Sequence, residues 1–284
     1  MSARSTGVDL ERPPLREADV LRVIGCAGGA SPLPTGGGAQ RLWREVRVVA
    51  ETGSTNADLV EAARAGAPEG VVRAAELQTA GRGRLGRSWT APPRSALTFS
   101  VLLRPRGVPG ARWSWAPLLV GVAAATATAR VAGLPVDLKW PNDLLVRGRK
   151  VAGVLVERVD GALVAGVGLN VSLHADELPT GGATSLLLEG AVSIDRATLL
   201  TAVLGDLAQH YGAWRGACGD ALRSGLRSAY RARCATIGRV VRVALPGGEE
   251  LHGEAVDVDA EGRLVVRTAR GDRVVGAGEI VHVR

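Results

Sequence analysis

Lysine is nearly absent from this sequence of 284 residues, which has only Lys139 and Lys150 although Lys and Arg together number 35. Asparagine is almost as rare and occurs only at Asn56, Asn142 and Asn170. Arginine carries a wide planar fork, whereas lysine carries a compact ammonium on a flexible stem, so the two do not replace each other freely. In a chain that uses arginine almost everywhere, the few lysines and asparagines are candidates for positions that require their particular chemistry.

Cysteine is scarce as well. Cys26, Cys218 and Cys234 are an odd number without a CxxC spacing, which indicates a reducing compartment and argues against a metal site. The longest uncharged apolar stretch, at 116–129, is shorter than the roughly 20 residues of a membrane span and predicts a buried helix instead. We therefore expect a cytoplasmic protein with no membrane contact and no metal ligands of its own.

Long runs of one charge are also missing. The net charge of +7 favours anionic partners such as nucleotides, nucleic acid or an acidic protein, but the basic residues do not form the runs of five or six that are typical of nucleic-acid-binding tails. A hydrophobic content of 46% and a charged content of 22% are those of a soluble globular protein. With one Phe and two Tyr, the core must consist mainly of Leu, Val and Ala.

The chain divides into three parts. Residues 1–40 are rich in proline and glycine and predict a flexible or partly ordered N-terminal extension with no room for a helix-turn-helix. Residues 41–235 predict the main domain. Residues 236–284 show short alternating strands separated by glycine turns, which predict a small SH3-like β barrel.

The main domain mixes strand and helix patterns. Strands are expected over 41–51, 71–78 and 96–105, and a meander over 136–171 has turns at 147–149 and 160–161. Helices are expected over 54–66, 116–132 and, with interruptions at Gly216 and Gly219, over 196–233. In the first helix, Thr55 and Asp58 fit a capping box. The predicted fold class is α+β with a mixed or antiparallel sheet and the C-terminal β module.

Residues 81–89, GRGRLGRSW, contain three glycines and three arginines. Glycines allow the backbone to approach an anion closely, and arginine forks bind carboxylate or phosphate. The spacing does not match a P-loop, so taken alone the segment also fits a mobile basic loop or a nucleic-acid contact.

Three further stretches place polar side chains at the ends of strands or helices. ETGSTN (51–56) lies at a strand–helix junction, where free helix N–H groups and hydroxyls can bind a polar ligand. WPND (140–143) displays an amide and a carboxylate in a rigid turn, and VGLNV places Asn170 at the end of an apolar strand. A buried amide there requires either a structural partner or a ligand.

Together, ETGSTN, QTAGRGRLGRSW, KWPNDLL, KVAGVLVE and GVGLNV, in this order and spacing, resemble the biotin protein ligase family over roughly residues 45–284. The resemblance implies a catalytic domain of the biotin/lipoate ligase type at 41–235 that binds biotin and ATP with Mg²⁺. It implies formation of biotinyl-5′-AMP, followed by transfer of biotin to a lysine of the biotin carboxyl carrier protein or domain of acetyl-CoA or acyl-CoA carboxylase. No nucleic acid partner is expected.

The resemblance also implies roles for individual residues. The residues implied to bind biotin are Ser54, Thr55, Asn56, Gln78, Gly81, Arg82, Gly83, Arg84 and Lys150. Those implied to bind ATP are Arg84, Trp89, Lys139, Asn142 and Asn170, and the implied catalytic residues are Lys150, Arg84 and Asp143.

Lys150 has a physical reason to be lysine. The biotin carboxylate must approach the α-phosphate of ATP although both are anionic, and a compact ammonium between them offsets the repulsion and stabilises the transition state. We expect Asp143 to receive or orient the acceptor amine, or else only to fix Lys139. Lys139 itself is expected to pair with Asp143, to orient the WPND turn or to contact phosphate.

Two departures from the family pattern and two rivals remain at this stage. Residues 1–40 lack the winged helix of the repressor members, so a ligase without DNA-binding activity is expected. Leu85 replaces an arginine that some members carry in the loop, which affects how tightly the adenylate is retained. The rival readings are a lipoate–protein ligase and a basic nucleic-acid-binding regulatory protein, which would show salt-dependent DNA binding.

Overall fold

The computed structural model describes residues 12–24, 42–179, 182–245 and 249–283. Its larger sheet has seven strands in the order β1-β2-β3-β7-β6-β5-β4. Their bounds are β1 Glu45–Thr52, β2 Val71–Gln78, β3 Ala96–Leu103, β4 Asp137–Lys139, β5 Asp143–Val146, β6 Arg149–Val159 and β7 Ala162–Asn170. Because β1 and β2 are parallel and the other neighbours antiparallel, the sheet is mixed, as predicted.

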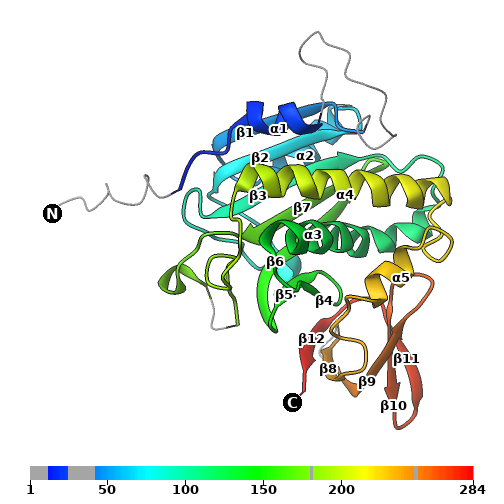
Figure 1. Ribbon diagram of the computed structural model, residues 1–284. Coiled ribbons are helices and arrows are strands. Elements are labelled where there is room, and N and C mark those ends of the chain that lie inside the picture. The colour runs from blue at the N-terminus through cyan, green and yellow to red at the C-terminus, as the bar shows by residue number, and fades with distance from the viewer. Residues whose placement is uncertain (1–11, 25–41, 180–181, 246–248, 284) are drawn as a thin grey trace.

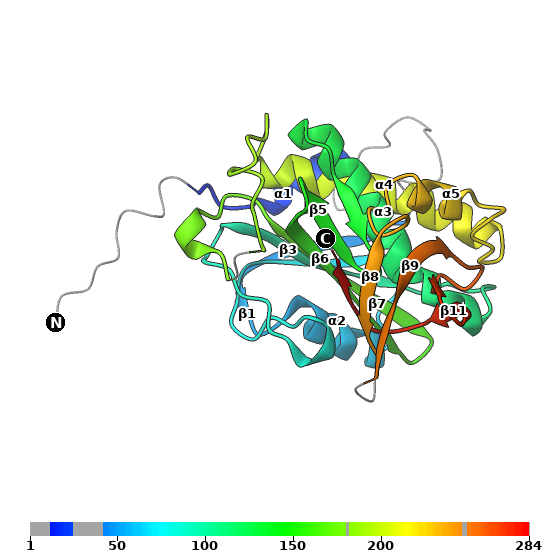
Figure 2. The same cartoon turned by 90° about the horizontal axis from the view of Figure 1, so that it is seen from below.

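Helices cover both faces of this sheet. α3 (Ala116–Ala132) and α4 (Arg196–Gly216) lie side by side on one face, and α2 (Thr55–Arg64) packs on β2, β3, β6 and β7 from the other, as Figures 1 and 2 show. The short helix α5 (Leu226–Arg231) follows α4. Three 3₁₀ turns lie at η1 Arg84–Gly86, η2 Gly110–Trp115 and η3 Ala175–Glu177. The predicted helices over 54–66, 116–132 and 196–233 are confirmed, the last as two separate helices.

Helix α3 is the buried helix that the apolar stretch predicts. Pro117 stands at its beginning and Gly133, with φ 65°, ends it in the left-handed conformation that glycine adopts at little cost. The segment Gly110–Ala132 is long and apolar enough to span a membrane by length and composition, but 72% of its most apolar window is buried inside the structure. It is therefore a core helix that packs against the sheet and against α4.

The N-terminal part contains a helix that the sequence did not reveal. α1 (Glu17–Ile24) buries Val20 and Ile24 in the main core and contacts α4 and β1. The Arg12 side chain, 4% exposed, forms an ion pair with Glu177. Residues 1–11 and 25–40 of the predicted extension, with Cys26, and residue 41 of the predicted main domain lie outside the described residues.

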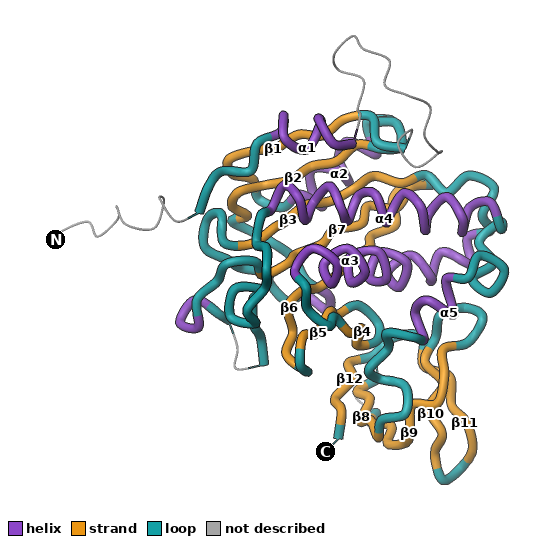
Figure 3. Tube along the Cα trace, viewed as in Figure 1, coloured by secondary structure: helices purple, strands orange, loops and turns teal. Residues whose placement is uncertain are grey.

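The C-terminal residues form a second, antiparallel sheet in the order β11-β10-β9-β8-β12. Its strands are β8 Val240–Ala244, β9 Glu250–Val258, β10 Leu264–Thr268, β11 Gly271–Val275 and β12 Glu279–His282. Figure 3 shows this sheet below α5, at the end of the molecule where β4 and β5 lie. The predicted α+β fold class with a C-terminal β module is confirmed.

Two tryptophans join this sheet to the main domain. Trp115 Nε1 donates to the Ala260 carbonyl over 2.7 Å, and Trp140 Nε1 donates to the Gly262 carbonyl over 3.0 Å. Gly262 has φ 79°, and a Cβ there would lie 3.4 Å from the Trp115 ring. The turn between β9 and β10 therefore packs on the start of α3 and on the first residue of WPND.

Candidate active site

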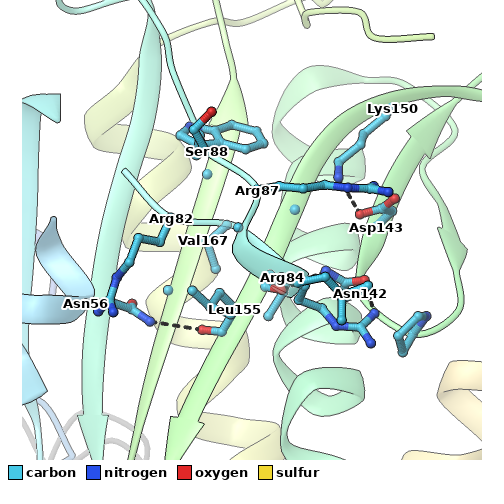
Figure 4. Close-up of a pocket in the computed structure, with 18 of the residues that line it drawn as sticks. Asn56, Arg82, Arg84, Arg87, Ser88, Asn142, Asp143, Lys150, Leu155 and Val167 are labelled. Atoms are coloured by element: carbon cyan, nitrogen blue, oxygen red, sulfur yellow. Dashed lines mark hydrogen bonds and ion pairs between the residues drawn. The ribbon is translucent and has the colours of Figure 1, made fainter. Parts of the chain in front are cut away.

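A cavity of about 650 Å³ opens where β6 and β7 pass the glycine–arginine loop, residues 81–89. Figure 4 shows side chains from this loop, α2, β5, β6 and β7 arranged around it. The predicted residues that line it are Ser54, Thr55, Asn56, Gln78, Arg82, Gly83, Arg84, Trp89, Lys139, Asn142, Asp143, Lys150 and Asn170. Of the predicted residues, Gly81 is not in the lining. The fold thus brings together segments that are up to 116 positions apart in sequence, between Ser54 and Asn170.

The strand–helix junction forms one end of the cavity. Ser54, not Thr55, is the N-cap of α2, because its hydroxyl accepts from the Ala57 N–H over 3.4 Å. The predicted capping box of Thr55 and Asp58 is therefore wrong. Thr55, the first helical residue, is buried and bonded through its N–H and hydroxyl to Gln78 Oε1, at 2.8 and 3.0 Å. These bonds fix Gln78 so that its amide nitrogen remains for another partner.

Asn56 is held by hydrogen bonds to β3 and β6. Its Nδ2 donates to Glu157 Oε2 over 2.8 Å, and its Oδ1 accepts from the Ser100 hydroxyl over 2.5 Å. Gly166 makes room for it, since a Cβ at this position would lie 2.2 Å from Asn56 Oδ1. Glu157 also pairs with Arg82 at 3.3 Å. The structure therefore adds Glu157 and Ser100, which the sequence analysis missed, as supports of the predicted residues.

The glycine–arginine loop is bound to its surroundings by its three arginines. Arg82 pairs with Glu157, Arg84 Nη1 donates to Asn142 Oδ1 over 3.0 Å, and Arg87 pairs with Glu279 of β12. Burial lowers the pKa of Arg84, and nearby Asp143 acts in the opposite direction. The loop therefore lies across the cavity (Figure 4).

Trp89 ends this loop with its ring on two glycines. A Cβ on Gly168 would lie 2.4 Å from Trp89 Cε2, and one on Gly153 would lie 3.6 Å from Trp89 Cζ3 and 3.4 Å from Lys150 Nζ. Trp89 Nε1 is buried with no hydrogen-bond partner in the described structure. Gly81 has a structural role, because its carbonyl accepts from the Trp89 N–H and a Cβ would lie 2.3 Å from the Trp89 carbonyl.

Lys150 and Asp143 face each other in the cavity (Figure 4). The Lys150 Nζ–Asp143 Oδ1 distance is 2.6 Å, with side chains 37% and 22% exposed. The pair of Asp143 with Lys139, one of the three alternatives for Lys139, is not formed, and Asp143 pairs with Lys150 instead. Asn142 is fixed between Arg84 and the Val154 carbonyl, to which its Nδ2 donates over 2.9 Å.

Lys139 lies on the same wall without an ion pair in the described part of the chain. Burial lowers its pKa, nearby Asp143 raises it, and Lys150 lowers it further. A half-buried ammonium without a partner is costly unless an anion compensates it. Lys139 is therefore the cation of this cavity most in need of a ligand.

Asn170 has the structural partner that a buried amide requires. It is 4% exposed, and its Nδ2 donates to the Thr184 carbonyl over 2.9 Å. The rest of the cavity was not predicted from sequence. Its floor includes Leu155 of β6, which lies opposite Gly166 of β7 and so follows the strand alternation, whereas nothing in the sequence places Glu279 and Ile280 of β12 beside it.

The chain resembles known proteins over its whole length. Residues 49–173 match the Biotin/lipoate A/B protein ligase family, and residues 236–283 match the Biotin protein ligase C terminal domain. A biotin–[acetyl-CoA-carboxylase] ligase of Mycobacterium tuberculosis is 42% identical over 284 residues, covering 98% of this chain and 100% of that protein. A protein of the same name from Paracoccus denitrificans is 32% identical over 245 residues, covering 82% and 98%.

A solved structure agrees with these sequence matches. The biotin protein ligase of Aquifex aeolicus, in complex with biotin and ATP, superposes with a TM-score of 0.71 at 27% identity, covering 85% of this chain and 100% of that one. Fold, cavity and sequence relatives lead to the same conclusion: this chain belongs to the biotin protein ligase family.

Proposed function

We propose that this chain activates biotin with ATP and transfers it to a lysine of a biotin carboxyl carrier domain of acetyl-CoA or acyl-CoA carboxylase. In the first step a biotin carboxylate oxygen forms a bond to the α-phosphorus and the bond to pyrophosphate breaks, which gives biotinyl-5′-AMP. In the second step the acceptor amine forms an amide with the acyl carbon and AMP leaves. The observation that carries the proposal is the convergence of Gln78, the glycine–arginine loop and Lys150 on one cavity.

The geometry suggests a division of labour within the cavity. The Ser54–Asn56 end and Gln78 offer neutral polar groups on a rigid, hydrogen-bonded frame, which suits the uncharged polar end of biotin. Arg84, Lys139 and Lys150 supply positive charge at the other end, where the carboxylate and the α-phosphate must meet. Trp89, Asn142 and Asn170 line the cavity around this charged end and are proposed to bind the nucleotide.

Asp143 has two roles in this scheme. It holds the Lys150 ammonium at 2.6 Å in the structure. When Lys150 turns to the carboxylate and phosphate, Asp143 becomes free to accept a proton from the acceptor amine or to orient it. The Lys150–Asp143 pair would then separate during each turnover.

Magnesium fits as a companion of the nucleotide rather than as a resident ion. Among the described residues, no three His, Cys, Asp or Glu side chains are grouped so as to hold a metal. The cavity carboxylates Asp143 and Glu279 are paired with Lys150 and Arg87. Mg²⁺ would be held chiefly by phosphate oxygens, whose charge it neutralises.

We also propose that residues 41–235 are the catalytic domain and 236–284 the C-terminal β domain, which the family match at 236–283 supports. A cytoplasmic location is proposed from the free thiols of Cys218 and Cys234 and the buried position of the apolar helix α3.

The test incubates the purified chain with ATP, biotin and an isolated biotin carboxyl carrier domain, followed by intact mass spectrometry. One biotinyl addition to the carrier domain is expected, and no addition would refute the proposal. Lipoic acid in place of biotin tests the lipoate alternative.

Lys150→Arg, which exchanges the compact ammonium for a wide fork, should lower biotin-dependent pyrophosphate release about 10²-fold because misplacement by about 1 Å has effects of that size. Near-normal release by this variant would exclude the role of Lys150.

A further inference from the structure

Glu189 is a fully buried carboxylate that does not line the cavity. Its side chain is 0% exposed, and it lies a few residues after Ala183, which does line the cavity. A carboxylate without water is unfavourable unless charged or hydrogen-bonding partners compensate it. The position therefore requires an explanation that the proposed chemistry has not supplied.

Three side chains compensate Glu189, and we call the four residues the Glu189 cluster. Arg149 Nη2 lies 2.7 Å from Oε1, and the buried Thr184 hydroxyl donates to the same oxygen over 2.7 Å. Arg147 Nη1 lies 3.2 Å from Oε2. Both carboxylate oxygens are thus used, and the two arginines, which are 62% and 48% exposed, are held at one end by a buried group.

The cluster surrounds the backbone of Lys150. Arg147 lies in the tight turn between β5 and β6, and Arg149 follows the turn and immediately precedes Lys150. On the other side, the Lys150 N–H donates to the Gly182 carbonyl over 2.9 Å, and the Thr184 N–H donates to the Lys150 carbonyl over 2.8 Å. Glu189 therefore binds a side chain on each side of the Lys150 backbone. Arg149 precedes Lys150 in β6, and Thr184 belongs to the segment that is hydrogen-bonded to the Lys150 backbone.

The β ladder alone does not fix the position of Lys150. The pairing of β5 with β6 shifts register between Leu144 and Leu145, opposite Lys150. The adjoining turn has positive φ at Arg147 (48°) and Gly148 (77°). An irregular strand end of this kind needs side-chain contacts to keep one register.

We propose that Glu189 is a positioning residue that fixes the backbone of Lys150 and thereby the place of its ammonium group. The inference rests on the proposed function, in which Lys150 joins the biotin carboxylate to the α-phosphate. Glu189 touches neither substrate. Its loss alters where the Lys150 stem begins, which changes the rate of the chemical step more than the binding of either substrate.

The experiment compares three variants of the full chain. Glu189→Gln keeps the size and an acceptor for Thr184 but removes the charge that holds both arginines. Arg149→Met removes an exposed partner and decides the question if Glu189→Gln does not fold. The control is Glu69→Gln, a carboxylate that holds Arg215 at 2.8 Å and accepts from the Arg104 N–H but does not line the cavity. Biotin-dependent pyrophosphate release gives kcat and the two KM values, and thermal melting gives stability.

For Glu189→Gln we expect kcat about tenfold lower, with KM for biotin and for ATP within about twofold of wild type, because misplacement of a reacting group acts on the transition state. Arg149→Met should show the same split with a smaller loss. Glu69→Gln should keep kcat even where its melting temperature falls as far. Unchanged kcat in Glu189→Gln, or an equal loss in Glu69→Gln at equal melting temperature, overturns the inference alone. Absence of biotin-dependent turnover in the wild-type chain overturns the proposed function, and the inference with it.

Discussion

At the scale of single residues, the two lysines of the cavity differ in their surroundings. Lys150 is neutralised by Asp143 at 2.6 Å, so its charge is available only when that pair separates. Lys139 has no ion pair in the described structure, and burial lowers its pKa. In the chain without ligand, Lys139 is thus free to bind a phosphate group, whereas Lys150 can act on the substrates only after it leaves Asp143.

The shifted pKa of Lys139 predicts a pH dependence. A lysine whose pKa is lowered by burial loses its proton, and with it the attraction for phosphate, at a lower pH than an ordinary lysine. As the pH rises through this lowered pKa, kcat/KM for ATP should fall, because that ratio reports groups of the free enzyme. The measurement is kcat/KM for ATP against pH. In Lys139→Met the alkaline decline should disappear from an already low baseline; the same decline in this variant would show that another group titrates.

The rarity of lysine and asparagine located these residues from sequence, but not their partners. Lys139 and Asp143, one of the pairs considered from sequence, are cross-strand neighbours in the β4–β5 pair. The structure pairs Asp143 with Lys150 instead, next to a register shift between β5 and β6 that leaves Val151 of β6 without a partner on β5. Such a shift leaves no signal in a local sequence pattern.

At the scale of elements, strand β7 shapes the cavity because two of its residues are glycines without side chains. Gly166 and Gly168 stand two positions apart and therefore face the same side of the strand. Asn56 fills the space above the first and the Trp89 ring the space above the second. The sequence predicted the strand and its end at Asn170, whereas the need for glycine depends on side chains that come from α2 and from the loop.

Gly168→Ala should therefore displace the Trp89 ring from its place in the cavity. The added Cβ would lie 2.4 Å from Trp89 Cε2, so the ring must move. We expect a loss of about 1–3 kcal/mol of stability from overpacking and at least a tenfold fall in kcat/KM, measured by thermal melting and pyrophosphate release.

Gly205→Ala is the matched control for this change. Gly205 is an exposed residue within α4, with nothing within 4 Å of an added Cβ. Alanine there should keep activity and raise stability by up to about 1 kcal/mol, because glycine is a poor helix former. If Gly168→Ala behaves like Gly205→Ala, the Trp89 ring does not depend on the glycine floor.

At the scale of the whole molecule, the C-terminal sheet completes the cavity. Glu279 and Ile280 of β12 line it, and His282 Nε2 lies 3.1 Å from the hydroxyl of Thr236, which accepts from the Trp140 N–H. One strand thus contacts the glycine–arginine loop directly and is linked to the WPND segment through Thr236. The sequence predicted a β module from its alternating strands, but the contact between β12 and a loop about 190 residues earlier depends on how the two sheets pack.

The Arg87–Glu279 pair makes this contact testable. Its hydrogen bond to Arg87 lowers the pKa of Glu279, so the carboxylate stays charged, and the pair intact, until the pH falls through that lowered value. The two side chains are 62% and 45% exposed, and exposed pairs contribute about 1 kcal/mol or less to stability.

Glu279→Gln should therefore leave the melting temperature nearly unchanged. It should free the loop, so that trypsin cleaves more rapidly after the arginines of residues 81–89 and KM for biotin and ATP rises severalfold.

Glu250→Gln is the control, because Glu250 pairs with Arg242 on the same sheet at 2.6 Å with similar exposure, outside the cavity lining. Equal cleavage of the loop in both variants would mean that β12 lies beside the loop without holding it. Faster cleavage in Glu279→Gln alone would mean that the C-terminal sheet holds the loop over the cavity through the Arg87–Glu279 pair.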